Sequence, residues 1–557
     1  MSKTSLEVVK KRPASDQADL VCLTVVDPLL RLERGGDRYT PEPRTTNDLA
    51  SASGPVAGNC KTTPTKGPVG PGYAKETMVK NFDFPSLAYL GGKWHPTSKT
   101  FPVKSPYSGE LVAEVADCGE AEAQMAADAA VAAFKEWKKL TGFERGKVLR
   151  KWNELLVAHQ EELGRLTALE MGKPITEAKG EVLYAASFVE WCAEEAARVN
   201  GELIHSRFPN KRQMAVYEPV GPVYAVTPWN FPTSMITRKA APALAVGCTV
   251  IVKPAEQTPL CALYLAKLWE EAGGPAGTLQ VLPASDPVPV SRVLMEDMRI
   301  RKITFTGSTP VGKILYRQGA DTLKRISLEL GGNAPFIIFE DADIEKAVQF
   351  TLLSKYRNAG QTCVTTNRIY VHKKLEADYT EALAEAVGQL KVGDPLDPST
   401  QIGPLVEQQG LDKVVSHVQD ALAKGAKVAV GGKPLGGLLY APTVLTSVQP
   451  GMRILEEETF GPVAPLVSFE DEEQAIAWAN HTDYGLAAYI WTKDLSRAFR
   501  VAEALEYGIV GVNDPVPSAM GSNLPFGGYK NSGLGREGGH WGIEEFLETK
   551  LISFLLP

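Results

Sequence analysis

Apolar and polar positions change their period repeatedly along residues 85–557. Four short apolar runs have the length and composition of buried strands: 223–227, 249–253, 279–282 and 303–306. Apolar residues at helical spacing separate these runs and predict helices near 233–246, 258–273, 288–298 and 310–320. This alternation is typical of a parallel sheet that carries helices on both faces.

A second series of the same kind begins near Ile326. Its predicted strands include 336–339, 368–371, 427–430 and 509–512, with helices near 343–357, 374–390 and 405–424. Three helical stretches precede the first series, at about 119–138, 143–170 and 175–199. The pattern therefore predicts an α/β fold with two doubly wound open-sheet domains and the active cleft between them.

Residues 1–78 lack this periodicity and are rich in Pro, Gly, Ser and Thr, which predicts a mostly disordered N-terminal tail. A mitochondrial targeting segment is one alternative. Glu7, Asp16, Asp19 and Asp27 count against it, because such segments are poor in acids. A further alternative is that Met78 is the true start.

Composition narrows the function classes. Of the 557 residues, 44% are hydrophobic and 22% are charged, as in ordinary globular proteins, and no apolar run is long enough to predict a membrane span. The formal net charge of −7 argues against nucleic acid or an acidic membrane as the main partner. The seven cysteines are scattered, without a CxxC or Cys/His cluster. We therefore expect no metal site and a reducing, cytoplasmic location.

A thiol and a carboxylate on polar, Gly-containing segments provide candidate chemistry. Cys363 ends the segment 356–363, and Glu329 lies within 327–333. A thiolate can attack a carbonyl carbon, and a carboxylate base can then activate the water that releases the acyl group. Asn230, between two prolines, could donate an amide N–H to a developing oxyanion. Taken singly, a free Cys is usually a small buried hydrophobe, and an Asn usually satisfies its own turn.

One strand end has the features of an anion site. Gly307 and Ser308 follow a predicted strand and open a helix, where backbone N–H groups can bind a cofactor pyrophosphate. The segment also resembles a P-loop as far as Lys313. Ile314 then replaces the hydroxyl residue that holds Mg²⁺, so a nucleoside triphosphate is the weaker alternative. A plain strand-to-helix turn is the other alternative.

A second strand end carries Lys253 and Glu256, which can both reach a ribose. A carboxylate that accepts the ribose hydroxyls would repel the 2′-phosphate of NADP, which favours NAD. The alternative is an acid at a helix start, near the positive end of the helix dipole.

Seven short motifs follow one another along residues 85–557, and their order is as distinctive as their composition. They are Pro-Trp-Asn-Phe-Pro at 228–232, Lys-Pro-Ala-Glu at 253–256, Phe-Thr-Gly-Ser at 305–308, Leu-Glu-Leu-Gly-Gly-Asn at 328–333, Gly-Gln-Thr-Cys at 360–363, Glu-Glu-Thr-Phe-Gly-Pro at 457–462 and Pro-Phe-Gly-Gly at 525–528. In these segments, and in the 34-residue separation of Glu329 and Cys363, the chain resembles the aldehyde dehydrogenase family.

The resemblance implies three parts. An NAD-binding domain would comprise 79–200 and 221–328, a catalytic domain 329–544, and a small β oligomerisation arm 201–220 and 545–557. Such arms pair with the sheet of a neighbouring subunit, so a homodimer or homotetramer is expected.

The resemblance also implies a mechanism. The Cys363 thiolate would add to an aldehyde, giving a thiohemiacetal whose oxyanion is held by Asn230 and the backbone N–H of Cys363. Hydride transfer to NAD⁺, preferred to NADP⁺, would leave a thioester, which water activated by Glu329 would hydrolyse. The residues expected to bind the cofactor are Thr227, Pro228, Trp229, Lys253, Glu256, Gly307, Ser308, Glu458 and Phe460.

The substrate is implied by a closer resemblance, to succinate-semialdehyde dehydrogenases, in the segments 235–239, 355–358 and 532–538. It places Arg238 and Arg357 on the distal carboxylate of the substrate, with Phe526 beside them. Two guanidinium groups suit a small anionic aldehyde. The alternative is that one or both arginines brace loops.

Two departures leave other substrates open. The segment 514–524 is longer than the equivalent loop, and Thr365 replaces a cysteine that some relatives use as a redox partner, so we expect no disulfide switch. The alternative substrates are glutarate semialdehyde, a sulfonated aldehyde or a neutral aliphatic aldehyde. A CoA-acylating relative and a non-catalytic structural homologue are also possible. Glu329 disfavours the first, and the intact set of Cys363, Glu329 and Asn230 disfavours the second.

Overall fold

The structure is a computed structural model that describes residues 83–517 and 521–557. The tail predicted for residues 1–78 lies outside the described residues. No helix of the described part is long and apolar enough to cross a bilayer.

The first sheet has eight strands in the order β2-β1-β9-β8-β7-β10-β11-β23. Its five central strands are parallel: β7 (Val223–Val226), β8 (Val250–Lys253), β9 (Leu279–Val281), β10 (Lys302–Thr306) and β11 (Arg325–Glu329). Antiparallel strands form its edges: β1 (Ala88–Leu90), β2 (Lys93–His95) and β23 (Gly533–Leu534). The chain runs from β7 outward to β9, then returns to β10 on the other side of β7. Loops after β7 and β10 therefore open at a topological switch point, where ligands bind in such sheets.

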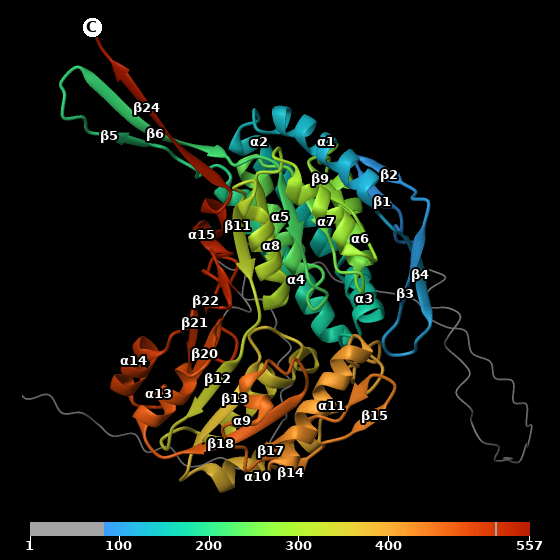
Figure 1. Cartoon of the computed structure of the whole chain (residues 1–557), viewed down its shortest axis with the longest axis vertical. Helices are drawn as coiled ribbons and strands as arrows, with labels where there is room; N and C mark the ends of the chain where they lie inside the picture. Colours follow the sequence, from blue (N-terminus) through green and yellow to red (C-terminus); the bar gives the residue numbers. More distant parts are fainter. Residues whose placement is uncertain (1–82, 518–520) are drawn as a thin grey trace, which may run out of the picture. The chain divides into compact units, whose positions relative to one another are not determined.

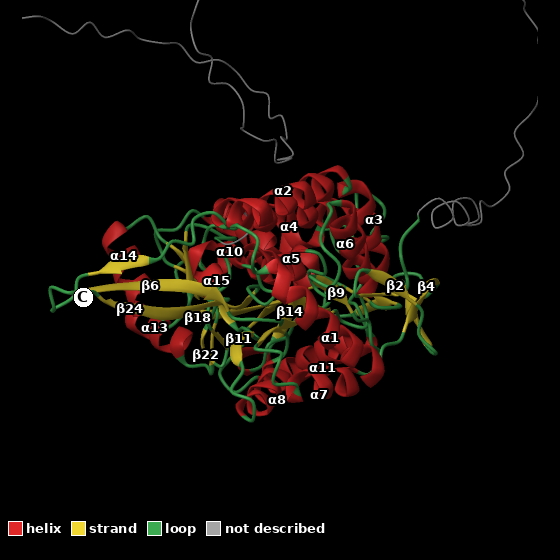
Figure 2. Cartoon of the chain, turned by 90° about the horizontal axis from the view of Figure 1, so that it is seen from above, coloured by secondary structure: helices red, strands yellow, loops and turns green. Residues whose placement is uncertain are grey.

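Helices cover both faces of this sheet (Figures 1 and 2). They are α1 (Glu120–Trp137), α2 (Gly142–Ala158), α3 (Gln160–Met171), α4 (Ile175–Glu195), α5 (Ser234–Val246), α6 (Pro259–Glu271), α7 (Pro287–Glu296) and α8 (Thr309–Ala320). Trp137, Trp152 and Trp269 are fully buried and meet edge to face, with ring centroids 6.2 and 5.2 Å apart. The single helix predicted for 143–170 is wrong, because the backbone leaves helical geometry at His159 while the apolar periodicity continues past it.

The second sheet has seven strands in the order β14-β17-β18-β13-β12-β20-β21. They are β12 (Ala334–Ile338), β13 (Thr366–His372), β14 (Lys427–Val430), β17 (Thr443–Thr446), β18 (Val463–Phe469), β20 (Ala487–Trp491) and β21 (Ile509–Val512). Its helices are α9 (Ile344–Thr351), α10 (Glu376–Gly388), α11 (Gln408–Ala423), α12 (Arg453–Glu456), α13 (Glu472–Asn480) and α14 (Leu495–Ala504), whereas α15 (Gly539–Glu544) packs on α4 and α5 of the first sheet. All neighbours are parallel except β14, which pairs antiparallel with β17 at the edge. Two doubly wound sheets thus form the predicted α/β fold.

Six further strands form three small two-stranded sheets. They are β3 (Thr100–Lys104) with β4 (Leu111–Ala116), β15 (Pro434–Gly436) with β16 (Leu439–Tyr440), and β19 (Tyr484–Gly485) with β22 (Tyr529–Lys530).

The helix predicted for 343–357 ends early, and this difference matters for the site. The α-helix stops at Thr351, a wider π-type turn spans Leu352–Tyr356, and Asn358 and Ala359 have left-handed backbones with φ of 53° and 54°. Such backbones are uncommon for residues other than glycine and persist only where the surroundings hold them. Periodicity cannot reveal this turn, which delivers the chain to Cys363.

Three strands form an arm that extends from the first sheet (Figure 1). They are β5 (Glu202–Ile204), β6 (Lys211–Pro219) and β24 (Leu547–Leu555), and β24 pairs with β6 over nine residues. Apolar side chains of Leu203, Leu551 and Leu555 are mostly exposed on it. The domain boundaries and the pairing of the arm with another subunit stay predictions.

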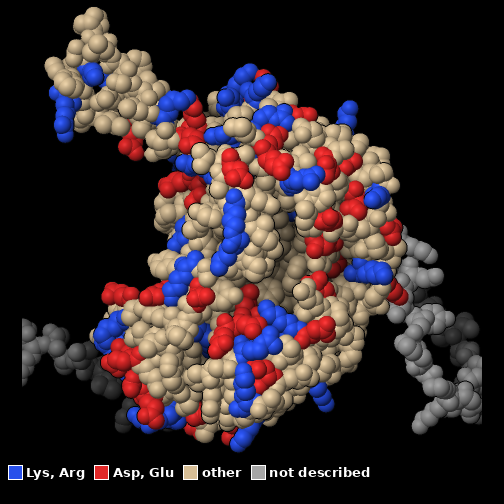
Figure 3. All heavy atoms as spheres, viewed as in Figure 1, with Lys and Arg blue, Asp and Glu red and all other residues tan. Residues whose placement is uncertain are grey.

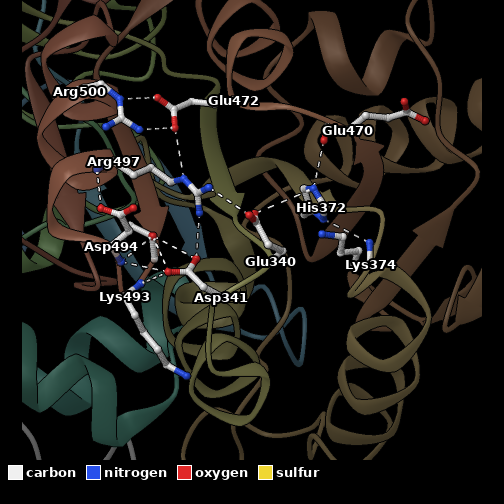
Figure 4. Close-up of polar contacts among 11 residues, drawn as sticks. Glu340, Asp341, His372, Lys374, Glu470, Glu472, Lys493, Asp494, Arg497 and Arg500 are labelled. Atoms are coloured by element: carbon white, nitrogen blue, oxygen red, sulfur yellow. Dashed lines mark hydrogen bonds and ion pairs between the residues drawn. The ribbon is translucent and has the colours of Figure 1, made fainter.

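A charged cluster, named here the Arg497 network, joins α14 to the second sheet (Figure 4). The Arg497 guanidinium lies 3.0 Å from Glu340, 3.2 Å from Asp341 and 3.2 Å from Glu472. It also lies over the ring of Phe339, 4.6 Å from its centroid. The pKa values of its three carboxylates lie below the usual range. Arg497 is among the causes for Glu340 and Glu472, whereas for Asp341 hydrogen bonds from the Lys493 N–H, the Thr492 hydroxyl and the Asp494 N–H favour the charged form.

Candidate active site

Cys363 lies where two pockets meet. It follows the left-handed turn and precedes β13, and its side chain is partly exposed. One pocket, of about 310 Å³, contains Glu458 in its wall and is named here the Glu458 pocket. The other, of about 240 Å³, is named the Arg357 pocket. A ligand in either pocket can reach the thiol.

The Glu458 pocket is built from the loops at the switch point of the first sheet. Pro228, Trp229 and Asn230 follow β7, and Gly307 and Ser308 follow β10; all five line the pocket. The opposite wall carries Glu458 and Phe460, whose ring meets Trp229 edge to face at 5.5 Å. The structure thus brings together six of the nine residues predicted for the cofactor, namely Pro228, Trp229, Gly307, Ser308, Glu458 and Phe460.

The other three predicted cofactor residues lie at two adjacent strand ends, Thr227 directly after β7 and Lys253 and Glu256 at the end of β8. Lys253 ends β8, beside the end of β7, and its carbonyl accepts a hydrogen bond from the Thr227 N–H at 3.2 Å. The buried Lys253 ammonium donates to the half-exposed Glu256 carboxylate at 3.2 Å. These groups extend the row of strand ends beyond the Glu458 pocket.

Several buried polar atoms around this pocket have no hydrogen-bond partner within the described residues. They are Oδ1 of Asn230 and Oγ1 of Thr306, which line it, and Oγ1 of Thr227 next to Pro228; Oγ1 of Thr362, which is also unpaired, lies at the Arg357 pocket. A buried donor or acceptor left unpaired costs about 1–3 kcal/mol. Such a group of unpaired atoms beside a cavity indicates a polar ligand.

Glu458 is held by a backbone donor. The Gly332 N–H donates to its Oε1 at 2.9 Å. Burial raises the pKa of Glu458 to about 7, opposed by that hydrogen bond and by the positive charges of Lys413 and Lys355. The carboxylate therefore titrates near neutral pH.

The Cys363 thiol is not activated by these surroundings. Burial, and then the negative charges of Glu458 and Glu329, raise its pKa to about 12, against a favourable contribution from Arg238. A thiolate at neutral pH therefore requires additional positive charge or removal of negative charge nearby.

Asn230 lies beside the nucleophile segment and does not merely satisfy its own turn. It is buried, and its Nδ2 donates to the Gln361 carbonyl at 3.1 Å. Its backbone carbonyl accepts from Lys173 Nζ at 2.9 Å and from Asn358 Nδ2 at 3.1 Å. One Nδ2 hydrogen is thus available for an oxyanion at Cys363.

Glu329 ends β11 and is buried, but it is not among the residues that line either pocket. Its Oε1 lies against Gly527, whose added Cβ would come within 2.9 Å. Burial, and next the charge of Glu537, raise the pKa of Glu329 well above its usual range, while Arg238 and Lys239 oppose this. The carboxyl therefore lies close enough to Cys363 to affect the thiol, but it faces the Glu537 side.

The Arg357 pocket contains the three predicted substrate residues, Arg238, Arg357 and Phe526. The Arg238 guanidinium pairs with Glu537 at 2.7 Å and lies 4.1 Å from the centre of the Phe526 ring. Arg238 Nη2 and Arg357 Nε have no hydrogen-bond partner among the described residues. Arg238 is therefore held by an ion pair, as expected if it braces a loop, and it also keeps an N–H group without a partner near the pocket.

Other charged residues of the site were not assigned from the sequence. Glu537 pairs with both Arg238 and Lys239, and Glu181 pairs with Lys173. The Glu177 carboxylate accepts the Asn358 N–H at 2.8 Å and so braces the left-handed turn. The sequence offered one signal for such residues: charged side chains on the otherwise apolar faces of the helices predicted near 175–199 and 233–246.

Comparisons with known proteins identify the family of this chain. Residues 94–552 match the model of the aldehyde dehydrogenase family. Glutarate-semialdehyde dehydrogenase of Pseudomonas putida is 49% identical over 84% of this chain and 98% of its own length, and succinate-semialdehyde dehydrogenase [NADP(+)] GabD of Escherichia coli is 49% identical over 84% and 98%. The crystal structure of succinate-semialdehyde dehydrogenase from Burkholderia pseudomallei has a TM-score of 0.84 at 47% identity, covering 87% of this chain and all of that one. The chain therefore belongs to the aldehyde dehydrogenase family and is an NAD(P)-dependent aldehyde dehydrogenase.

Proposed function

We propose that this enzyme oxidises a small aldehyde bearing a distal carboxylate, with succinate semialdehyde as the first candidate. The observation that carries the proposal is the presence of unpaired guanidinium N–H groups, of Arg238 and Arg357, at the 240 Å³ pocket that also contains Cys363. A carboxylate would satisfy these donors by charge-assisted hydrogen bonds. Relatives named as glutarate-semialdehyde and succinate-semialdehyde dehydrogenases support this class of substrate.

The Glu458 pocket fits the nicotinamide end of an NAD(P) cofactor. Its unpaired buried atoms require polar partners, its Trp229 and Phe460 rings suit a flat heterocycle, and Gly307 and Ser308 offer a helix start for phosphate. Glu458 would hold a ribose, and Lys253 with Glu256 the other ribose. When bound, the oxidised nicotinamide supplies the hydride acceptor.

Cys363 performs the covalent chemistry. Its thiol first loses its proton to solvent, and the thiolate sulfur then bonds to the aldehyde carbon while the C=O π electrons move to the oxygen. The resulting oxyanion is stabilised by the Asn230 amide and the Cys363 N–H; one such donor is worth about 2.7–4 kcal/mol. Loss of hydride from that carbon converts the thiohemiacetal into a thioester. Arg238 and Arg357 hold the far end of the substrate, which fixes the aldehyde carbon at the sulfur.

Glu329 performs the second half of the reaction. After turning from Gly527 toward the thioester, its carboxylate takes a proton from water, the hydroxide adds to the acyl carbon, and the C–S bond breaks to release the acid. Because the pKa of Glu329 is raised, its basic form becomes more abundant as the pH rises. Turnover limited by this step should therefore increase with pH.

The cofactor preference, assembly and location complete the proposal. The half-exposed Glu256 carboxylate favours NAD⁺ over NADP⁺, although the E. coli relative is named for NADP⁺.

The exposed apolar side chains of the β5–β6–β24 arm favour pairing with a second copy, as a homodimer or homotetramer. Five free cysteines among the described residues favour a reducing, cytoplasmic location.

The test is a substrate panel read by NAD(P)H absorbance. Succinate semialdehyde and butanal have equal chain lengths, as do glutarate semialdehyde and pentanal, so each pair isolates the carboxylate. We expect kcat/KM to favour the charged member of each pair by at least about tenfold, since a charge-assisted hydrogen bond contributes roughly 1.5–3 kcal/mol. Preference for the uncharged aldehydes would refute the two-arginine proposal.

A further inference from the structure

Lys355 is a buried charged residue that the proposed reaction does not use. It lies in the π-type turn Leu352–Tyr356, eight residues before Cys363, and is fully buried. Its ammonium donates to the Asn367 amide oxygen at 3.1 Å, and within residues 83–517 and 521–557 it forms no ion pair. A buried ammonium with a neutral partner is costly, because the lost hydration is not replaced by an opposite charge.

Glu458 is the carboxylate that acts on this ammonium. Burial lowers the pKa of Lys355 to about 7, and the charge of Glu458 opposes that change. In return, the pKa of Glu458 is lowered by the Gly332 hydrogen bond, by Lys413 of α11 and then by Lys355. The two lysines differ in position, because Lys413 lines the Glu458 pocket and Lys355 does not.

Asn367 and Gly332 connect Lys355 to Glu458. Asn367 Nδ2 donates to the Gly332 carbonyl at 3.4 Å, and the Gly332 N–H donates to Glu458 at 2.9 Å. Gly332 also packs directly on the nucleophile segment, since a Cβ on it would lie 2.3 Å from the Cys363 carbonyl oxygen. The Asn367 amide that accepts from Lys355, the Glu458 carboxylate and the Cys363 backbone therefore all adjoin a single glycine.

We propose that Lys355 is a positioning residue, whose buried ammonium, linked through Asn367 and Gly332 to Glu458, supplies part of the counter-charge that holds this carboxylate ready to accept cofactor ribose hydroxyls. This inference rests on the cofactor role proposed above for Glu458. The charge of Glu458 also has a consequence for the thiol. Among charged groups, Glu458 opposes ionisation of Cys363 most strongly, ahead of Glu329, while Arg238 favours ionisation. Neutralising Glu458 should weaken cofactor binding and, in the same protein, make Cys363 easier to ionise.

A double-mutant cycle tests the proposal on NAD⁺ binding, measured by calorimetry without substrate. Lys355→Met keeps a straight side chain and removes the charge. We expect its Kd for NAD⁺ to rise about tenfold, since a charged acceptor forms hydrogen bonds roughly twice as strong as a neutral one. Glu458→Gln should raise Kd at least as much, and the double variant should bind no more weakly than Glu458→Gln alone.

The matched control is Lys302→Met. Lys302 is also fully buried, but it pairs with Glu545 at 3.1 Å at the start of β10. Its Kd for NAD⁺ should be unchanged, so an equal rise there would attribute the effect to general loss of stability and overturn the proposal.

Alkylation of Cys363 by iodoacetamide in the cofactor-free protein gives a second measurement. The pH midpoint of alkylation should fall in both Lys355→Met and Glu458→Gln, whereas a purely structural role for Lys355 would not lower it. If Lys355→Met fails to fold, Asn367→Asp retains the lysine and offers it a competing carboxylate, and it should also raise Kd for NAD⁺.

The outcomes separate the two proposals. An unchanged Kd in Glu458→Gln would remove the cofactor role of Glu458. Weaker NAD⁺ binding in Glu458→Gln with an unchanged Kd in Lys355→Met would overturn the role of Lys355 alone. An unchanged Kd in Asn367→Asp, or additive effects on Kd in the double variant, would do the same.

Discussion

Two clusters of buried or half-buried arginines differ in how completely their charges are paired. The Arg497 network surrounds one guanidinium with three carboxylates, and none of its side-chain atoms is left buried without a partner within the described residues. The Arg357 pocket contains two guanidinium groups, and each has a buried nitrogen without a hydrogen-bond partner there. Both clusters belong to one chain and one fold.

The difference separates stability from function. Paired charges contribute to folding, because the cost of dehydration is offset inside the protein. Unpaired buried donors destabilise the empty protein and are retained where a ligand pairs with them. Acidic and basic side chains are interspersed over the face shown in Figure 3, so pairing, rather than the presence of charge, distinguishes the two clusters.

The largest expected effect is at the thiol. Cys363→Ala removes the nucleophile, and we expect kcat to fall by about four orders of magnitude or more. Because Cys363 has no ion pair or disulfide to lose in the described structure, its Tm and its Kd for NAD⁺ should stay near the wild-type values. Measurable turnover in a purified Cys363→Ala protein would remove the covalent mechanism.

The next effect separates the two halves of the reaction. In Glu329→Gln, stopped-flow absorbance should show an NADH burst of up to one equivalent per site, followed by turnover slowed by about 10²–10⁴-fold, because the base for thioester hydrolysis is absent. The rise of steady-state turnover with pH should also be lost. Normal steady-state turnover would show that another group activates water.

The smallest effect is on stability, in the Arg497 network. Arg497→Met should lower the free energy of unfolding at pH 7 by about 2 kcal/mol, after allowance for solvent screening, with kcat/KM unchanged. The pKa values of Glu340, Asp341 and Glu472 are depressed in the folded state. Their stabilisation is therefore complete above the ordinary carboxylate pKa, about 4, and is lost as the pH falls through the depressed values.

Urea unfolding of wild type and Arg497→Met at pH 7 and pH 3 measures this effect. The difference between the two proteins should shrink at pH 3. An equal difference at both pH values would mean that packing on Phe339, rather than charge pairing, is what Arg497 contributes.

The fold could be predicted because its signals are local. Strand and helix periods repeat in both sheets, and short motifs fix the strand ends that carry Gly307, Lys253 and Asn230. The break at His159 and the turn at Asn358 could not be predicted, since neither interrupts the apolar pattern and the second is held by distant Glu177.

The candidate site could be predicted by residue type but not by orientation. Motifs identified Cys363, Glu329 and Arg238, whereas the pairing of Arg238 with Glu537, almost 300 residues away, exists only after folding. The same is true of the turned-away position of Glu329. Long-range charge pairs leave no periodic signal in a single sequence.

The most direct test of the pairing argument is the ratio of kcat/KM for succinate semialdehyde to that for butanal, measured in Arg357→Met, Arg497→Met and wild type. The account predicts that the ratio falls by about tenfold or more in Arg357→Met, at little cost in Tm, and stays at the wild-type value in Arg497→Met. An unchanged ratio in Arg357→Met, or an equal fall in both variants, would contradict it.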